Sequence, residues 1–190
     1  MFAFKKKYFL IIESIKNIDL TKIKRNKKFA IIYRNEKNLE ELNEIKKFRK
    51  NCALKLIKFY VANNLKLAVQ LFADGLYISS YNKSFRHSHI QRKNFDIIGS
   101  AHDASEIYLK NYQRCNQILL SKLFKVDYDS KAPYLGVIKF NNYLKISNNL
   151  IPLGGIKYSN LNNQRQIKSS GFAIYSEIKK KPAKIINRLF

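Results

Sequence analysis

The sequence predicts an α/β fold in which parallel strands alternate with helices. Continuous rather than alternating apolar character is typical of strands covered on both faces, and segments between the apolar runs have helical periodicity. Eight such runs fit a (β/α)8 TIM barrel, and a doubly wound open sheet is the alternative. The runs are Tyr8–Ile12, Phe29–Tyr33, Leu56–Val61, Gly75–Ile78, Phe95–Ile98, Gln117–Leu120, Leu150–Leu153 and Gly171–Tyr175.

Helical faces are visible in two of the connecting segments. One face consists of Leu39, Leu42, Ile45 and Phe48, and the other of Leu65, Ala68, Val69 and Phe72. We also expect a helix over Asn160–Ile167, whereas the polar segment 14–28 has little periodicity. With 190 residues the chain is shorter than the usual barrel of about 250, so we expect a barrel of minimal length. No low-complexity linker divides it, which predicts one domain over 1–190.

The charge is strongly positive but diffuse. Lys and Arg number 37 against 13 Asp and Glu, a net charge of +24. Such an excess raises the alternative of a basic nucleic-acid-binding protein. However, 29 of the 37 are Lys, spread over the whole length, and Arg is the residue usually used for bidentate phosphate or base contacts. This pattern favours a compositional bias, and we expect no nucleic-acid partner.

The cysteines and apolar runs predict a cytoplasmic location. Cys52 and Cys115 form no C-x-x-C or metal-ligand spacing, which is typical of a reduced compartment. Near the N-terminus, lysines precede an apolar run, as in a signal peptide. That run ends at Glu13, short of the roughly 7–15 residues of a signal sequence, so we interpret it as a strand. No run approaches the roughly 20 apolar residues of a membrane span, and we expect no membrane partner.

The few glycines mark a candidate phosphate site. Gly154 and Gly155 directly follow the run Leu150–Leu153. Glycines at the carboxyl end of a barrel strand let backbone N–H groups approach a phosphate closely, and the late strands are the usual place for such a site. A tight turn with no ligand is the alternative interpretation.

Several segments, taken in order and spacing, resemble the thiamine-phosphate synthase and TenI family over about residues 8 to 178. They are Ala73–Ile78, Ile98–His102, Leu120–Phe124, Ala132–Gly136, Ile151–Ile156 and Ser170–Ser176. The resemblance implies a (β/α)8 barrel. It also implies a transferase, thiamine-phosphate diphosphorylase, that joins hydroxymethylpyrimidine diphosphate to thiazole phosphate and releases pyrophosphate, with Mg²⁺ on the diphosphate. TenI-type members isomerise the thiazole in the same pocket.

The resemblance also assigns candidate site residues. The thiazole-phosphate cradle falls on the glycine pair Gly154 and Gly155 and on the backbone of Ile174, Tyr175 and Ser176. Ser100 matches a hydroxyl that contacts the diphosphate, and Arg34 an arginine on the same group. His102 stands at a strand end, where a general base or a pyrophosphate donor could act, or where it could serve as a capping residue.

The chain departs from the family pattern at several positions. The two Mg²⁺ aspartates fall on Asn63 and Asn82, poorer ligands for a hard dication, so Mg²⁺ is implied by the family but doubtful here. We therefore expect negligible Mg²⁺ binding to the free protein. An expected histidine is Tyr77, and the tautomerase histidine falls on Lys122.

A further departure lies after the sixth run. A Thr-x-Thr-Lys segment becomes Val126–Asp129, with Lys131 two places late. Asp127 and Asp129 would repel a diphosphate unless Lys125, Lys131 or Mg²⁺ offsets them. The alternative to a synthase is therefore a TenI-like barrel without synthase activity. Such a barrel would bind or process a phosphorylated thiazole or a related small molecule. For either, we expect Gly155→Val to abolish phosphate binding and leave the fold intact.

Overall fold

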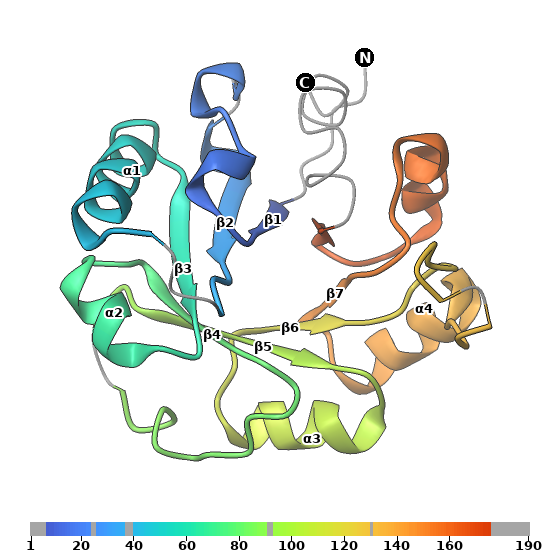
Figure 1. The fold of residues 1–190 in the computed structure, drawn as a ribbon. Coiled ribbons are helices and arrows are strands. Elements are labelled where there is room, and N and C mark those ends of the chain that lie inside the picture. Colours follow the sequence, from blue (N-terminus) through green and yellow to red (C-terminus); the bar gives the residue numbers. More distant parts are fainter. Residues whose placement is uncertain (1–6, 24–25, 37–39, 91–92, 130, 176–190) are drawn as a thin grey trace.

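A computed structural model describes residues 7–23, 26–36, 40–90, 93–129 and 131–175. Parallel strands form a nearly closed barrel with helices on the outside (Figure 1). The strands are β1 (Lys7–Ile12), β2 (Phe29–Tyr33), β3 (Lys58–Ala62), β4 (Gly75–Ile78), β5 (Asp96–Ala101), β6 (Gln117–Leu120), β7 (Leu150–Pro152) and β8 (Gly171–Ile174). They pair in the order β7-β6-β5-β4-β3-β2-β1-β8, with no reversal. The predicted (β/α)8 barrel is confirmed, and the doubly wound alternative is wrong.

The barrel is closed between β7 and β8 by side chains. The two strands lie in contact, but no backbone ladder joins them within the described residues. Ile151 of β7 and Ala173 of β8 both belong to the apolar cluster inside the barrel. Strand β7 is only three residues long and ends in Pro152, which has no N–H to donate. A short strand with a missing donor accounts for the absent ladder.

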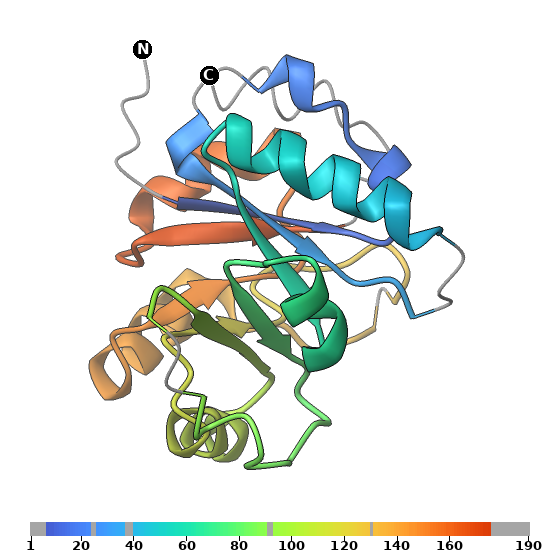
Figure 2. The same ribbon diagram turned by 90° about the vertical axis from the view of Figure 1, so that its left-hand side faces the viewer.

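Short connections explain how 190 residues suffice. The described α-helices are α1 (Leu42–Leu54), α2 (Leu65–Gln70), α3 (Ala104–Tyr112) and α4 (Gly136–Ile146), and α1 and α2 lie outside the strands (Figure 2). Three 3-10 turns, η1 (Ile15–Asn17), η2 (Leu20–Lys22) and η3 (Asn26–Lys28), follow β1. The helix expected over Asn160–Ile167 is instead a 3-10 segment, η4 (Tyr158–Gln166). None of these helices is long and apolar enough to cross a bilayer.

Two apolar residues that the sequence assigned to a strand and a helix lie instead in the turns that follow helices. Leu56, expected to begin a strand, lies in the turn after α1 with φ of 56° and is 59% exposed. Phe72, expected on the buried face of a helix, follows the end of α2 with φ of 49° and is 74% exposed. Both occupy positions past a helix end, where the chain turns out of the helix. Leu39 of the first predicted helical face lies outside the described residues.

The strands separate two apolar layers, which explains their continuous apolar character. Phe9 and Ile11 of β1 point into the barrel, and their neighbours Tyr8 and Leu10 pack on the outside. The other strands divide in the same way, because successive side chains of a strand point to opposite faces. The interior cluster contains Tyr77. The barrel is therefore filled by side chains, and a cavity can form only beyond the strand ends.

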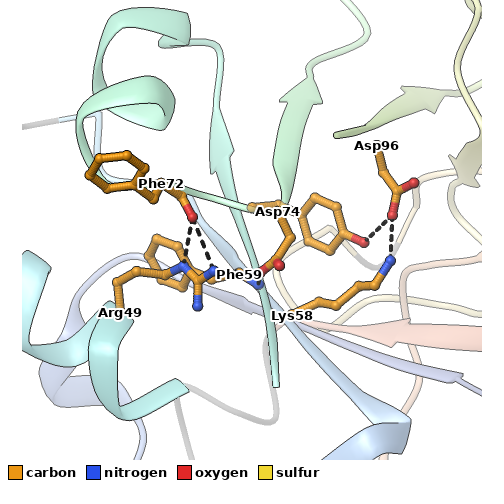
Figure 3. A network of polar contacts seen from close by, with 7 residues as sticks. Arg49, Lys58, Phe59, Phe72, Asp74 and Asp96 are labelled. Carbon is orange, nitrogen blue, oxygen red and sulfur yellow. Dashed lines mark hydrogen bonds and ion pairs between the residues drawn. The ribbon is translucent and has the colours of Figure 1, made fainter. Parts of the chain in front are cut away.

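A polar network lies at the amino ends of three neighbouring strands of the barrel (Figure 3). Asp74, just before β4, accepts the backbone N–H of Phe59 at 2.7 Å and pairs with Arg49 of α1 at 3.2 Å. Asp96, which begins β5, pairs with Lys58 at 2.7 Å. These contacts join α1, β3, β4 and β5 at the amino ends of the strands. Asp74, part of one family-like segment, therefore belongs to the scaffold.

Candidate functional site

A cavity of about 380 Å³ lies at the carboxyl ends of the strands. Seven of the predicted site residues line it: Arg34, Ser100, His102, Gly154, Gly155, Ile174 and Tyr175. They come from segments 140 residues apart in the chain, and the parallel barrel brings them to one end. Ser176, the remaining residue of the predicted phosphate cradle, lies outside the described residues.

The turn after β7 has unoccupied backbone N–H groups beside the cavity. Gly154 and Gly155 have φ of 91° and 67°, a region that favours glycine. Within the described chain, the N–H groups of Gly154, Gly155 and Ile156 have no hydrogen-bond partner. The carbonyls are occupied: Gly154 accepts the Phe124 N–H at 3.1 Å and Gly155 the Asn160 side-chain amide at 2.8 Å. Successive N–H groups in a turn provide a concave site for an anion.

Two charged or polar groups at the cavity are already paired with carboxylates. Arg34 contacts Glu36 through Nε at 2.9 Å and through a terminal nitrogen at 2.8 Å. Burial acts to lower the pKa of Arg34, but Glu36 outweighs burial and raises it. The Tyr175 hydroxyl donates to Glu13, and burial followed by this bond raises the pKa of Tyr175 to about 12. An anionic ligand would compete with Glu36 for Arg34.

Ser100 and His102 lie at the end of β5. The Ser100 hydroxyl interacts with the phenol of Tyr77; burial raises the pKa of Tyr77, and this interaction acts in the opposite sense. The His102 ring Nδ1 lies 3.0 Å from a Glu106 carboxylate oxygen, which also accepts the His102 backbone N–H at 2.7 Å. Asp103 caps the same helix by accepting the Glu106 N–H at 2.9 Å. The N-cap of α3 is therefore Asp103 and not His102, whose ring is held by Glu106 and remains half-exposed at the cavity.

In the loop after β6, the carboxylate of Asp127 is paired with a lysine other than the two that the sequence suggested. Asp127 lines the cavity and forms an ion pair with Lys157, which follows the glycine turn and also lines the cavity. Lys125 and Lys131, the predicted diphosphate contacts, are exposed and outside the cavity lining. Lys157 is therefore the residue that offsets Asp127.

Asn63 and Asn82, on which the family's Mg²⁺ aspartates fall, support the loop after β4. Asn63 Oδ1 accepts the Ser79 N–H at 3.0 Å, and its Nδ2 donates to Ser79 Oγ at 2.5 Å and to the Tyr81 hydroxyl at 2.9 Å. Asn82 Oδ1 accepts the Ser84 N–H at 3.0 Å. Both carboxamide oxygens thus have backbone partners, and neither residue lines the cavity. The described residues contain no group of three or more His, Cys, Asp or Glu that could hold a metal. These positions do not fit Mg²⁺.

Sequence reasoning missed several residues of the cavity lining. Ser79, Ser80 and Tyr81 follow β4 directly and form one wall. Polar residues immediately after a buried parallel strand are a usable signal, because carboxyl ends of such strands gather at one end of a barrel. Lys157 could have been suspected from its place three residues after Gly154.

Comparisons with known proteins agree with this arrangement. A family model described as thiamine monophosphate synthase matches residues 20–178. Thiamine phosphate pyrophosphorylase from Pyrococcus furiosus has a similar structure, with a TM-score of 0.74, 18% identity, and coverage of 98% of this chain and 96% of that one. The 3-keto-L-gulonate-6-phosphate decarboxylase of Vibrio cholerae has a TM-score of 0.63 and 12% identity, covering 97% of this chain and 99% of that one.

No curated protein matches the sequence significantly. At these identities the structural likeness supports the fold alone, whereas the family match covers most of the chain, from η2 to beyond β8. The chain belongs to the thiamine monophosphate synthase family.

Proposed function

We propose that this protein binds thiazole phosphate in the cavity, with the phosphate on the turn after β7. The observation that carries the proposal is that Gly154, Gly155 and Ile156 line the cavity in succession and that their N–H groups have no partners in the described chain. Ile174 and Tyr175, at the end of β8, line the same cavity. Backbone donors of this kind bind a phosphate without needing a basic side chain.

The rest of the cavity suits a planar ring. Tyr81 and Tyr128 line it with exposed aromatic faces, and Leu153 adds apolar surface. Lys122 also lines it, with Nζ 5.7 Å from the centre of the Tyr128 ring. Within the described chain Lys122 has no carboxylate partner, so it is available to an anionic group on a bound ligand. Aromatic walls with one available cation match a phosphorylated heterocycle.

Formation of thiamine phosphate is the second candidate function. Arg34 and Ser100, the predicted diphosphate contacts, line the same cavity as the glycine turn, which favours this candidate. In the reaction, the thiazole nitrogen forms a bond to the pyrimidine methylene carbon while the carbon–oxygen bond to diphosphate breaks. The diphosphate leaves with the electron pair, so its growing charge must be stabilised. Arg34 could contribute only by exchanging Glu36 for the diphosphate, and no step is assigned to Mg²⁺.

One experiment tests both candidates. Thiazole phosphate is titrated calorimetrically into the wild-type protein, Lys122→Met and the control Lys139→Met, a lysine exposed on α4. We expect binding to wild type and to the control, and weaker binding to Lys122→Met. Absence of binding to wild type would overturn the first candidate. Adding hydroxymethylpyrimidine diphosphate, with and without Mg²⁺, and measuring thiamine phosphate by chromatography decides the second.

The cellular setting follows from the same proposal. The buried thiols Cys52 and Cys115 fit the reducing cytoplasm, where we place the protein. Phosphorylated small molecules are then its partners rather than nucleic acid. Retention on DNA that falls steeply with salt would contradict this choice of partner.

A further inference from the structure

Lys110 of α3 is a lysine with no exposed surface. Its Nζ donates three hydrogen bonds of 2.8 Å, to the carbonyl of Ser79, the carbonyl of Asn82 and the side-chain oxygen of Gln113. All three acceptors are neutral, and no carboxylate of the described chain bonds to the ammonium; the Glu106 carboxylate, one turn earlier on α3, acts on it only from a distance. Burial lowers the pKa of Lys110. Burying an ammonium is unfavourable, and a methionine would fill the space without that penalty. A lysine at this buried position is therefore explained by the three hydrogen bonds that it donates.

Gln113, the C-cap residue that directly follows α3, is also fully buried and completes the contact. Its Nε2 donates to the carbonyl of Asn82 at 3.0 Å and to that of Ser84 at 2.9 Å. Lys110 and Gln113 together bind three carbonyls of one short segment, Ser79 to Ser84. These carbonyls are thereby directed toward α3, behind the segment.

The same segment is also held by the residue that follows β3. Asn63, at the end of β3, has φ of 54° and contacts the Ser79 N–H, the Ser79 hydroxyl and the Tyr81 hydroxyl. Between these two anchors, Ser79, Ser80 and Tyr81 line the cavity. A loop with no regular secondary structure is thus fixed by side chains from two elements.

We propose that Lys110 is a positioning residue, whose buried ammonium holds the cavity wall formed by Ser79, Ser80 and Tyr81 in its binding shape from behind. The wall then depends on the Lys110 ammonium and on the amide of Asn63, one of the two positions on which the family's Mg²⁺ aspartates fall. The shape of the wall needs no divalent ion. Only the identity of the ligand rests on the proposed function.

Lys110→Met tests this, because methionine has a similar length and no donors. Lys139→Met makes the same change on an exposed face, and Ile107→Val shortens a buried side chain of α3 without removing a hydrogen bond to the loop. Two quantities are measured: hydrogen exchange of the peptide spanning 79–84, and affinity for thiazole phosphate and for inorganic phosphate. Inorganic phosphate has no ring, so it reports on phosphate binding without ring contacts to the wall.

We expect exchange of the 79–84 amides to accelerate about tenfold or more in Lys110→Met, because one hydrogen bond is worth about a tenfold step and the variant loses three. Thiazole phosphate should bind about tenfold more weakly, since it contacts the wall that these bonds position and not Lys110 itself. Inorganic phosphate should bind as in wild type, and both controls should leave all these values unchanged. Addition of EDTA should not alter the exchange of wild type.

Unchanged exchange in Lys110→Met would overturn the proposal. So would faster exchange with unchanged thiazole phosphate affinity, because Lys110 would then be structural only. If wild type does not bind thiazole phosphate, the proposed function fails by itself, and exchange alone decides the role of Lys110.

Discussion

Gly155 and Gly136 form a matched pair for measuring how the glycine turn is built. Their φ values are nearly equal, 67° and 69°. A Cβ at Gly155 would lie 2.3 Å from the carbonyl oxygen of Phe124 and 2.6 Å from that of Lys125. A Cβ at Gly136 would meet nothing within 4 Å. Substitution by alanine therefore carries the same backbone penalty at both positions and a steric penalty at only one.

The difference can be given a magnitude. A residue with a Cβ in the left-handed region costs about 1 kcal/mol, which is the whole effect expected for Gly136→Ala. Gly155→Ala must also displace the Phe124–Lys125 backbone, and overpacking of this kind costs about 1–3 kcal/mol more. We expect the free energy of unfolding to fall by about 1 kcal/mol in Gly136→Ala and about 2–4 kcal/mol in Gly155→Ala. Urea titration followed by circular dichroism measures both, provided the slopes agree.

Equal destabilisation of the two variants would refute the steric reasoning, since the Phe124 loop would then yield without cost. Unequal destabilisation would mean that Gly155→Val, expected from the sequence to leave the fold intact, disturbs it instead. A larger side chain at this position cannot remove phosphate binding and leave the surrounding loop intact. Loss of phosphate binding must therefore be measured on the alanine variant under conditions where it is fully folded.

Three further predictions concern the scaffold. Asp74→Asn should lower the free energy of unfolding by about 1–3 kcal/mol, because the Phe59 N–H and an arginine lose a charged acceptor, with inorganic phosphate affinity unchanged; a wild-type urea midpoint would contradict it. Burial acts to raise the pKa of Glu40, but hydrogen bonds from hydroxyl and amide groups outweigh it and hold the value below 4.5, so this contribution to stability is present above pH 4.5 and lost as pH falls through the folded value. Urea titrations at pH 7 and pH 4 should differ less for Glu40→Gln than for wild type, and equal differences would exclude the effect. Burial raises the pKa of Cys52 and of Cys115 to about 12, so a disulfide reagent at pH 8 should label them only after unfolding, and rapid labelling of native protein would disprove it.

The strands could be predicted because each is covered on both faces. Tyr8 and Leu10 pack toward the outer layer and Phe9 and Ile11 toward the barrel interior, so the run is apolar throughout. Periodicity says less about where a helix ends. Leu56 continues the apolar run of the following strand in the sequence, but it lies in the turn after α1 and is exposed. Its positive φ turns the backbone before β3 begins.

The site was partly predictable for a related reason. Gly154 and Gly155 are visible because glycine is scarce and follows a strand. Lys110 and Gln113 are not visible, because a Lys and a Gln spaced one turn apart on a helix look like an ordinary solvent-facing pair. Their burial depends on a loop some 30 residues earlier in the chain, and no local pattern records which carbonyls that loop will turn toward them.

The large positive net charge of this protein does not give its cavity a matching excess of unpaired cations. The chain carries +24, yet Arg34 and Lys157 at the cavity each face a carboxylate of the chain. A phosphate that takes one of these cations breaks its ion pair with Glu36 or Asp127, so exchanging one anion for another gains little. The N–H groups of the glycine turn have no such competitor within the described chain. Phosphate affinity should therefore follow the shape of that turn, which depends on how closely the backbone at Gly155 approaches the neighbouring loop.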